Sequence, residues 1–287
     1  MNGRGHVPAE NMRLWREQLG ENRELRHLQL IALARAMADA LEESEGFPLE
    51  LPELEASPEA STFWQAVSID ERLALCREIL ALRPDLMQAA EALSLPPAAP
   101  RLARLAGEVF SRAADGFAPL LPGARAVYVS ALSELTEAVA SGEADLAILP
   151  IEDAKGTRFL QFYEELERLD LHVTHTCDVP LGEEGQHGRF ALISRLYAPS
   201  TPIRAERIVE CRVPSDDPRS LTELLSVAAD AGLILRRLDA MPVSYAEDSF
   251  HHYPIFLAPK GTALLELYLR LFLPGVAVLG QYLHIKE

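Results

Sequence analysis

The chain has 287 residues, of which 48% are hydrophobic and 24% are charged, a composition typical of a soluble globular protein with two or three domains. The formal net charge of -16 at pH 7 argues against a nucleic-acid partner or an anionic membrane surface, because phosphate groups would be repelled. The three cysteines, Cys76, Cys177 and Cys211, are far apart, so the sequence indicates neither a disulfide framework nor a metal site, and we expect no cofactor.

The N-terminal third is predicted to form a helical domain over residues 8–96. Its first residues lack the apolar core of a signal peptide, which favours a cytoplasmic location. Ser68 and Glu71 have the spacing of the capping box that opens a helix, and this helix should run to Arg83. The proline-rich residues 96–100 form a stiff linker that marks the end of the domain.

A helix followed by a short buried strand is the clearest pattern in the middle of the chain. Ser141-Gly142 should end the helix, and Leu146–Leu149 is a continuously apolar strand. Pro150 is expected to end that strand, which would place Glu152-Asp153 just beyond its carboxyl end. Ligands of open α/β sheets bind at this edge. Periodicity alone leaves open the alternative of two solvated carboxylates.

Residues 138–152 read A-V-A-S-G-E-A-D-L-A-I-L-P-I-E, and this stretch resembles the first lobe of prephenate dehydratase. The family pattern continues with Asn-Ser, whereas this chain has Asp153-Ala154. The resemblance implies a small α/β lobe over residues 101–197. It also makes Glu152 a candidate catalytic carboxylate.

Gly107–Ser111 resembles the G-T-F/Y-S loop of the same family, whose hydroxyls and backbone amides lie near the substrate. Val109 replaces the threonine, so Ser111 carries the hydroxyl that remains. The resemblance therefore makes Ser111 a candidate ligand-binding residue. The residues themselves leave open an amphipathic helix from Arg101 to Ala114, with Ser111 exposed.

The family continues into a second lobe and returns through a strand that bears T-R-F. Here the strand that ends near Val179 is followed, within ten residues, by His187–Ser194, which resembles the returning strand with Gly188 in the position of threonine. We therefore expect one lobe without an inserted second lobe. Thr157-Arg158-Phe159 also spells T-R-F, but at the start of a helix, and we interpret this match as a coincidence.

Conversion of prephenate to phenylpyruvate expels hydroxide together with carbon dioxide, so a positioned group must protonate the leaving oxygen. The family uses a threonine hydroxyl, which Gly188 cannot supply. His187 could donate instead, because an unperturbed imidazole titrates near neutrality, although a single histidine in a glycine-rich turn is usually solvated. The candidate catalytic residues are Glu152, His187 and Arg189.

Residues 205–287 resemble the ACT domain that follows the catalytic part of prephenate dehydratases, with strands and helices in the order βαββαβ. The best candidate for a membrane-spanning segment also lies here, at Leu264–Leu283. It is interrupted by Glu266, Arg270 and Pro274, so we expect no membrane span.

In the family, ACT domains pair, and phenylalanine binds at their interface near G-A-L and E-S-R-P. Asp217–Leu221 and Leu238–Pro242 stand in these places. The ligand-binding residues that the resemblance implies are Arg219, Ser220, Leu221, Asp239 and Met241. Asp239 would meet the ammonium group of an amino acid. A pairing module without any ligand is an equal alternative.

The sequence thus predicts a multidomain α+β and α/β protein with a helical domain, a dehydratase-like lobe and a ferredoxin-like ACT domain. The expected function is non-catalytic amino-acid sensing or regulation in aromatic amino-acid metabolism. We expect a cytoplasmic homodimer that binds a phenylalanine-like amino acid or a prephenate-like molecule. Two alternatives remain, an active prephenate dehydratase with a cleft completed by dimerisation, and a divergent chorismate mutase in the N-terminal helices.

Overall fold

The computed structural model describes residues 26–35, 37–38, 67–84, 94–182, 185–199, 205–215, 218–242, 250–260 and 262–286. The chain divides into two compact units, residues 1–90 and 91–287. In the first unit, α4 (Ile69–Leu82) begins at the predicted capping box, in which the Glu71 amide donates to Ser68 Oγ and the Ser68 amide donates to Glu71 Oε2. Much of the predicted helical domain lies outside the described residues.

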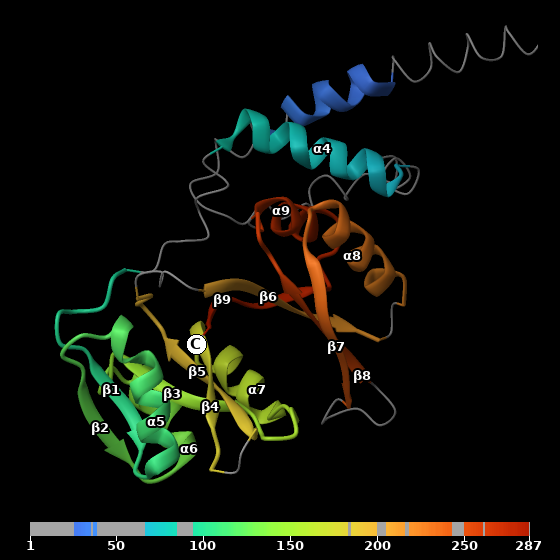
Figure 1. The fold of residues 1–287 in the computed structure, drawn as a ribbon. Helices are drawn as coiled ribbons and strands as arrows, with labels where there is room; N and C mark the ends of the chain where they lie inside the picture. The colour runs from blue at the N-terminus through green and yellow to red at the C-terminus, as the bar shows by residue number, and fades with distance from the viewer. Residues whose placement is uncertain are drawn as a thin grey trace, which may run out of the picture. The chain divides into compact units, whose positions relative to one another are not determined.

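The second unit begins with an α/β portion, residues 101–197, which we call the lobe (Figure 1). Its elements are β1 (Arg101–Leu105), α5 (Glu108–Phe117), η3 (Ala118–Leu120), β2 (Arg125–Val129), α6 (Leu132–Ala140), β3 (Leu146–Glu152), α7 (Leu160–Arg168), β4 (His172–Pro180) and β5 (His187–Ser194). Strands β2, β1 and β3 are parallel, and β5 lies antiparallel between β3 and β4. The predicted return of residues 187–194 into the sheet of β3 is therefore confirmed.

The remainder of the unit, residues 205–286, is called the C-terminal module. Its elements are β6 (Ala205–Pro214), α8 (Pro218–Asp230), β7 (Ile234–Pro242), β8 (Phe250–Leu257), α9 (Ala263–Phe272) and β9 (Ala277–Ile285). The predicted βαββαβ order is confirmed. The strands follow the order β9-β6-β8-β7, with antiparallel neighbours throughout, and α8 and α9 lie together beside them (Figure 1).

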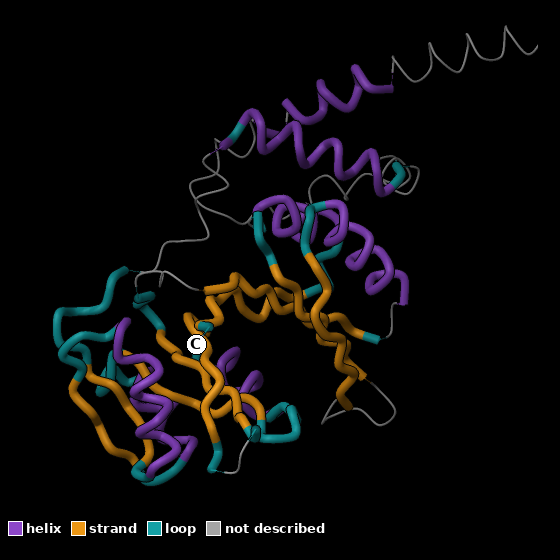
Figure 2. The backbone as a smooth tube through the Cα atoms, in the orientation of Figure 1, coloured by secondary structure: helices purple, strands orange, loops and turns teal. Residues whose placement is uncertain are grey.

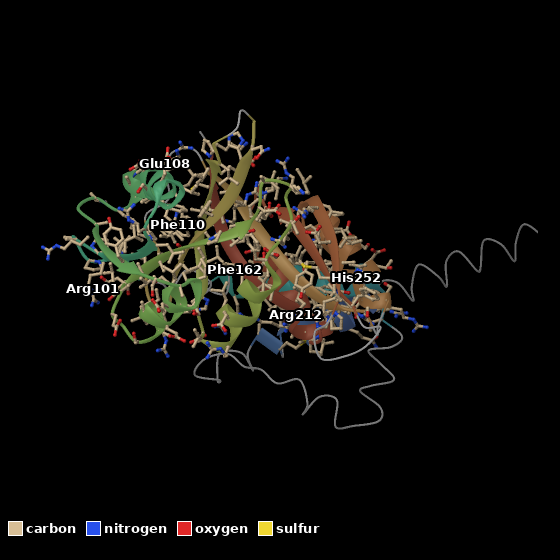
Figure 3. All side chains as sticks on the ribbon, turned by 90° about the horizontal axis from the view of Figure 1, so that it is seen from below. Arg101, Glu108, Phe110, Phe162, Arg212 and His252 are labelled. Atoms are coloured by element: carbon tan, nitrogen blue, oxygen red, sulfur yellow. The ribbon has the colours of Figure 1, made fainter. Side chains whose placement is uncertain are left out.

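The two parts share one nine-stranded sheet, because β4 of the lobe pairs in parallel with β9 of the C-terminal module (Figure 2). Only two residue pairs form this junction, His175 with Leu283 and Thr176 with His284. An apolar core also crosses it. Phe162 of α7, which lies in the interior in Figure 3, belongs to the same buried cluster as residues of β6, β8 and β9. Sheet and core together hold the lobe against the C-terminal module.

Two local predictions were wrong. Pro150 does not end the central strand, because β3 continues to Glu152. A shift in register between Pro150 and Glu152 accommodates the proline, which has no N–H to donate, at an irregular position of the ladder. The alternative of a helix from Arg101 to Ala114 is also incorrect, since Arg101–Leu105 pairs as a strand with both β2 and β3.

One polar side chain of the junction has no partner. His175, on β4, is 1% exposed, and neither ring nitrogen has a hydrogen-bond partner within the described residues. Burial lowers the pKa of this imidazole from 6.5 to about 4, because the charged form would lose its hydration. The unfolded chain therefore binds a proton at a higher pH than the folded chain does.

This difference predicts that the free energy of unfolding is highest above pH 6.5 and decreases as the pH drops towards 4. The His175 contribution to the loss should reach about 3 kcal/mol. His175→Phe should remove that part of the pH dependence, whereas His172→Phe, at an exposed position of the same strand, should retain it. Urea unfolding between pH 7.5 and 4 measures this. Equal pH slopes in the wild type and His175→Phe would contradict the prediction.

Candidate functional site

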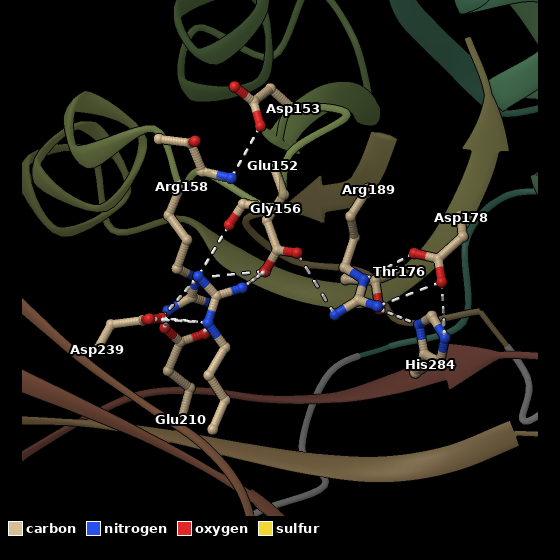
Figure 4. Close-up of polar contacts among 12 residues, drawn as sticks. Glu152, Asp153, Gly156, Arg158, Thr176, Asp178, Arg189, Glu210, Asp239 and His284 are labelled. Atoms are coloured by element: carbon tan, nitrogen blue, oxygen red, sulfur yellow. Dashed lines mark hydrogen bonds and ion pairs between the residues drawn. The ribbon is translucent and has the colours of Figure 1, made fainter. Parts of the chain in front are cut away.

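The site is built around Glu152, the last residue of β3 at the carboxyl end of the parallel strands. Its side chain is 9% exposed and is approached by three guanidinium groups (Figure 4). Glu152 Oε1 lies 3.3 Å from Nε of Arg158 and 3.6 Å from Nη1 of Arg237. Its other oxygen, Oε2, lies 3.8 Å from Nη1 of Arg189. Glu152 thus faces cations of the protein itself.

Arg158, from the segment between β3 and α7, is the most deeply buried of these cations. It pairs with Glu210 of β6, and both side chains are 2% exposed. The contact uses both ends of the guanidinium fork, with Nη1 donating to Oε1 and Nη2 donating to Oε2 at 2.9 Å. Burial, the largest single effect, would lower the pKa of Arg158, but the charge and hydrogen bond of Glu210 together with the nearby Tyr163 and Tyr282 raise it. Arg158 therefore keeps its positive charge.

Two tyrosines complete the surroundings of Glu210. The hydroxyl of Tyr163, on α7, donates to Glu210 Oε2 at 3.1 Å, and that of Tyr282, on β9, donates to the same oxygen at 3.2 Å. Burial and, after it, the negative charge of Glu210 raise the pKa of both phenols well above its usual range. Both hydroxyls keep their protons and act as donors. The Tyr163 ring also stacks against Arg158, whose Cζ lies 5.0 Å from the ring centroid.

A second group of contacts links β7 to the segment that follows β3. Arg237 Nε donates to Asp239 Oδ1 at 2.8 Å, and Arg237 Nη2 donates to the backbone carbonyl of Gly156 at 2.8 Å. The other oxygen of Asp239, Oδ2, lies 3.9 Å from Arg158 Nε. Gly156 has a φ of +74°, a conformation that glycine adopts without strain, and this turn presents its carbonyl to Arg237.

A third group joins β4 and β5 to β9. Arg189 Nε donates to Asp178 Oδ1 at 2.8 Å, and Nη2 donates to Oδ2 at 3.2 Å. Burial, the largest single effect, would raise the pKa of Asp178, but the hydrogen bonds and charge of Arg189 together with smaller effects of neighbouring groups lower it. His284 lies 3.6 Å from Asp178 Oδ2, and its Nδ1 is 3.0 Å from Thr176 Oγ1. Burial, followed by the nearby charge of Arg189, lowers the pKa of His284.

These side chains form one set, which we call the junction cluster. Its members are Glu152, Arg158, Asp178, Arg189, Glu210, Arg237 and Asp239. Four carboxylates and three guanidiniums face one another across the boundary between the lobe and the C-terminal module. Their charges nearly cancel, so the cluster binds the two parts together instead of presenting an excess charge to a ligand.

Three of the residues singled out from sequence lie in this cluster, namely Glu152, Arg189 and Asp239. His187 does not. It is exposed at the start of β5, opposite Pro180, and no hydrogen bond or ion pair joins it to Glu152 among the described residues. The ammonium partner proposed for a ligand, Asp239, is already paired with Arg237.

The sequence resemblance matches Gly188 to a threonine of the family, and a side chain added at Gly188 would be crowded. A Cβ on Gly188 would lie 3.0 Å from Leu181 Cδ1 and 3.2 Å from the Glu152 carbonyl oxygen. Both distances are shorter than ordinary van der Waals contact. A threonine at this position would therefore require Leu181 or the backbone of Glu152 to shift by a few tenths of an ångström.

The remaining candidates lie elsewhere in the second unit. Ser111 is in the first turn of α5, where its hydroxyl donates to the Gly107 carbonyl at 3.1 Å and accepts from Arg104 Nη1 at 3.2 Å. Met241 is buried on β7, two residues beyond Asp239. The other three occupy the first turn of α8, namely Arg219, Ser220 and Leu221.

Sequence reasoning missed the two central residues, Arg158 and Glu210. Arg158 was dismissed with the coincidental T-R-F, although a lone arginine just before an apolar helix face is a plausible buried cation. Glu210 interrupts the apolar alternation of Arg207–Val213, and a carboxylate at an inward position of a strand needs a cation. That interruption was the available signal. Only the fold identifies Arg158 as the partner.

Within the described ranges, no cluster of three or more His, Cys, Asp or Glu side chains is arranged to hold a metal ion. The helices among these residues are too short or too polar to cross a membrane. No protein-family model matches the chain, and no curated protein sequence matches it.

Solved structures do match. Prephenate dehydratase from Streptococcus mutans superimposes with a TM-score of 0.53 at 17% identity, over 65% of this chain and 99% of that one. This chain has a prephenate dehydratase-like fold. GqqA, described as a novel type of quorum-quenching acylase, gives a TM-score of 0.48 at 20% identity, over 63% and 94% of the two chains. Prephenate dehydratase from Arthrobacter aurescens, solved with L-Phe, gives 0.45 at 15% identity, over 63% and 89%. The fold assignment rests on the Streptococcus mutans structure.

The central pair gives a direct prediction. Arg158→Met should destabilise the protein by about 3–5 kcal/mol, because it leaves the Glu210 carboxylate buried without its cation. Arg168→Met is the matched control on α7, since Arg168 makes an exposed pair with Glu165 at 2.7 Å, and it should cost less than about 1 kcal/mol. Urea unfolding midpoints compare the two variants. Similar losses of stability in the two variants would show that the buried pair contributes no more than an exposed one.

Proposed function

We propose that this protein is a relative of prephenate dehydratase that does not dehydrate prephenate, and that its C-terminal module serves amino-acid sensing or regulation. The ion pairs of Glu152 support the first part of the proposal. Its carboxylate contacts Arg158, Arg189 and Arg237, and the last of these belongs to the C-terminal module. The carboxyl edge of β3 is therefore covered at the place where a ligand of an α/β sheet would bind.

Two further observations support the absence of dehydration. The connection from Pro180 to His187 joins paired strand ends, so the lobe has no room in its chain for a second lobe that would close a cleft. Gly188 has no hydroxyl, and a Cβ added there would lie 3.0 Å from Leu181 Cδ1. A donor for the leaving oxygen is missing from the position that the family uses.

The purified protein should form no phenylpyruvate from prephenate above the uncatalysed background, measured by steady-state absorbance with an active prephenate dehydratase as the positive control. Gly188→Thr should not create activity, because the new side chain would be crowded by Leu181 and by the Glu152 carbonyl oxygen. Turnover by the wild type that disappears in Glu152→Ala would overturn the proposal. It would instead favour an active dehydratase with a cleft completed by a second copy.

The exposed edge of β7 supports the pairing of two copies. β7 is the last strand of the sheet, and Ile234, Leu235 and Leu238 on it are 52%, 44% and 42% exposed. An apolar edge strand with unpaired backbone groups tends to associate with another strand. We propose that a second copy pairs antiparallel along β7, as in a two-fold symmetric dimer. The sensed amino acid would bind near this dimer interface.

Light scattering should give twice the chain mass of 31.7 kDa. Leu238→Lys should weaken dimerisation at least tenfold, because a charge would be placed in the paired edge. Leu132→Lys, which changes an exposed leucine of α6, is the control and should leave the dimer intact. The same preparation, titrated with common amino acids, should show a rise in Tm for one of them. A monomeric wild type, or a dimer indifferent to Leu238→Lys, contradicts the pairing.

A further inference from the structure

The two partners of the buried pair come from different parts of the second unit. Arg158 and Tyr163 belong to the lobe and lie just after β3, whereas Glu210 belongs to β6 of the C-terminal module. Arg158 donates to both oxygens of this carboxylate (Figure 4). The Tyr163 hydroxyl donates to Oε2 of the same carboxylate at 3.1 Å. The lobe thus contributes one guanidinium and one hydroxyl, which together bind one carboxylate.

Stability alone does not account for this arrangement. Both charged side chains are 2% exposed, so folding removes them from water at a cost comparable to the energy of their attraction. Apolar side chains of similar volume would often hold two modules together as well or better. A planar fork with an added hydroxyl donor is, however, the arrangement by which proteins recognise free carboxylates.

The position of the pair points in the same direction. Arg158 forms an isolated β-bridge with Glu152, so it is fixed at the carboxyl end of β3. This is the edge at which open α/β sheets bind small molecules. Arg158 also contacts a second carboxylate, because its Nε donates to Glu152 Oε1 at 3.3 Å. The guanidinium would therefore remain paired and oriented if Glu210 left.

We propose that Arg158 and Tyr163 form a carboxylate-binding site of the lobe, and that Glu210 occupies it as an internal ligand. The C-terminal module then acts as an autoinhibitory lid whose carboxylate competes with a small molecule that carries the same group. Binding of that molecule requires the withdrawal of Glu210. Carboxylate binding at this site is tested independently of the prephenate assay and of dimerisation.

Acetate tests the site directly, because Glu210→Ala deletes a CH2–COO⁻ group of nearly the size of acetate. The Tm of Glu210→Ala should rise with added acetate in a saturable way, since binding to the folded state stabilises it by mass action. Acetamide, which has the same shape without charge, should have no such effect, nor should sodium chloride at equal ionic strength. Wild-type protein should bind acetate at least tenfold more weakly, because Glu210 already fills the site.

Matched variants separate this site from a general salt effect. Glu206→Ala removes a carboxylate from the same strand, where Glu206 makes more exposed pairs with Arg236 and Lys286, and acetate should not rescue it. Adding Arg158→Met to Glu210→Ala should abolish the acetate response. Adding Tyr163→Phe should weaken acetate binding by about tenfold, the usual effect of losing one hydrogen bond to a charged group.

A folded Glu210→Ala that ignores acetate overturns the proposal, as does an acetate response that survives Arg158→Met. If Glu210→Ala folds only in acetate, that dependence is itself the expected rescue. If it folds in neither condition, Glu210→Gln provides the second measurement, because the amide keeps the shape and weakens the internal competitor. Its acetate affinity should exceed that of the wild type at least tenfold, and equal affinities would overturn the lid.

Discussion

The buried contact between Arg158 and Glu210 is the constraint on which the second unit depends. Both side chains are 2% exposed, so loss of Arg158 would leave the Glu210 carboxyl buried without its cation, at a large cost in stability. Two phenols, Tyr163 and Tyr282, supply the hydrogen bonds that make the burial tolerable. Because one tyrosine belongs to α7 and the other to β9, the same contact fixes the separation of the lobe from the C-terminal module.

The likeness in fold to a prephenate dehydratase does not by itself establish the chemistry of the site. A fold provides positions, and the side chains at those positions decide what happens there. Glu152 lies at the end of β3, where its carboxylate is surrounded by guanidiniums of the protein itself. At Gly188 a Cβ would lie 3.0 Å from Leu181 Cδ1, so a longer side chain there would need its neighbours to shift.

Local features of the fold could be predicted from sequence, and non-local features could not. The capping box of Ser68 and the strand Arg125–Val129 follow from residues within a few positions of one another. The β4–β9 junction consists of two residue pairs whose members are more than 100 positions apart. The periodicity of the sequence does not predict such a pairing. Glu152 was found because a motif surrounds it. Arg158 was overlooked because its importance comes entirely from Glu210, which lies in another module.

The hairpin between β4 and β5 is a position at which additional residues could be inserted into the lobe. Pro180 and His187 face each other as the last pair of the two strands, so the ends of any segment placed between them are already held together. The entropy of closing a loop grows only with the logarithm of its length, and a long insertion there would add little to the cost of folding. Loop-closure entropy alone therefore presents little obstacle to an inserted domain in this hairpin. The same property makes the turn a natural place to graft a fluorescent reporter.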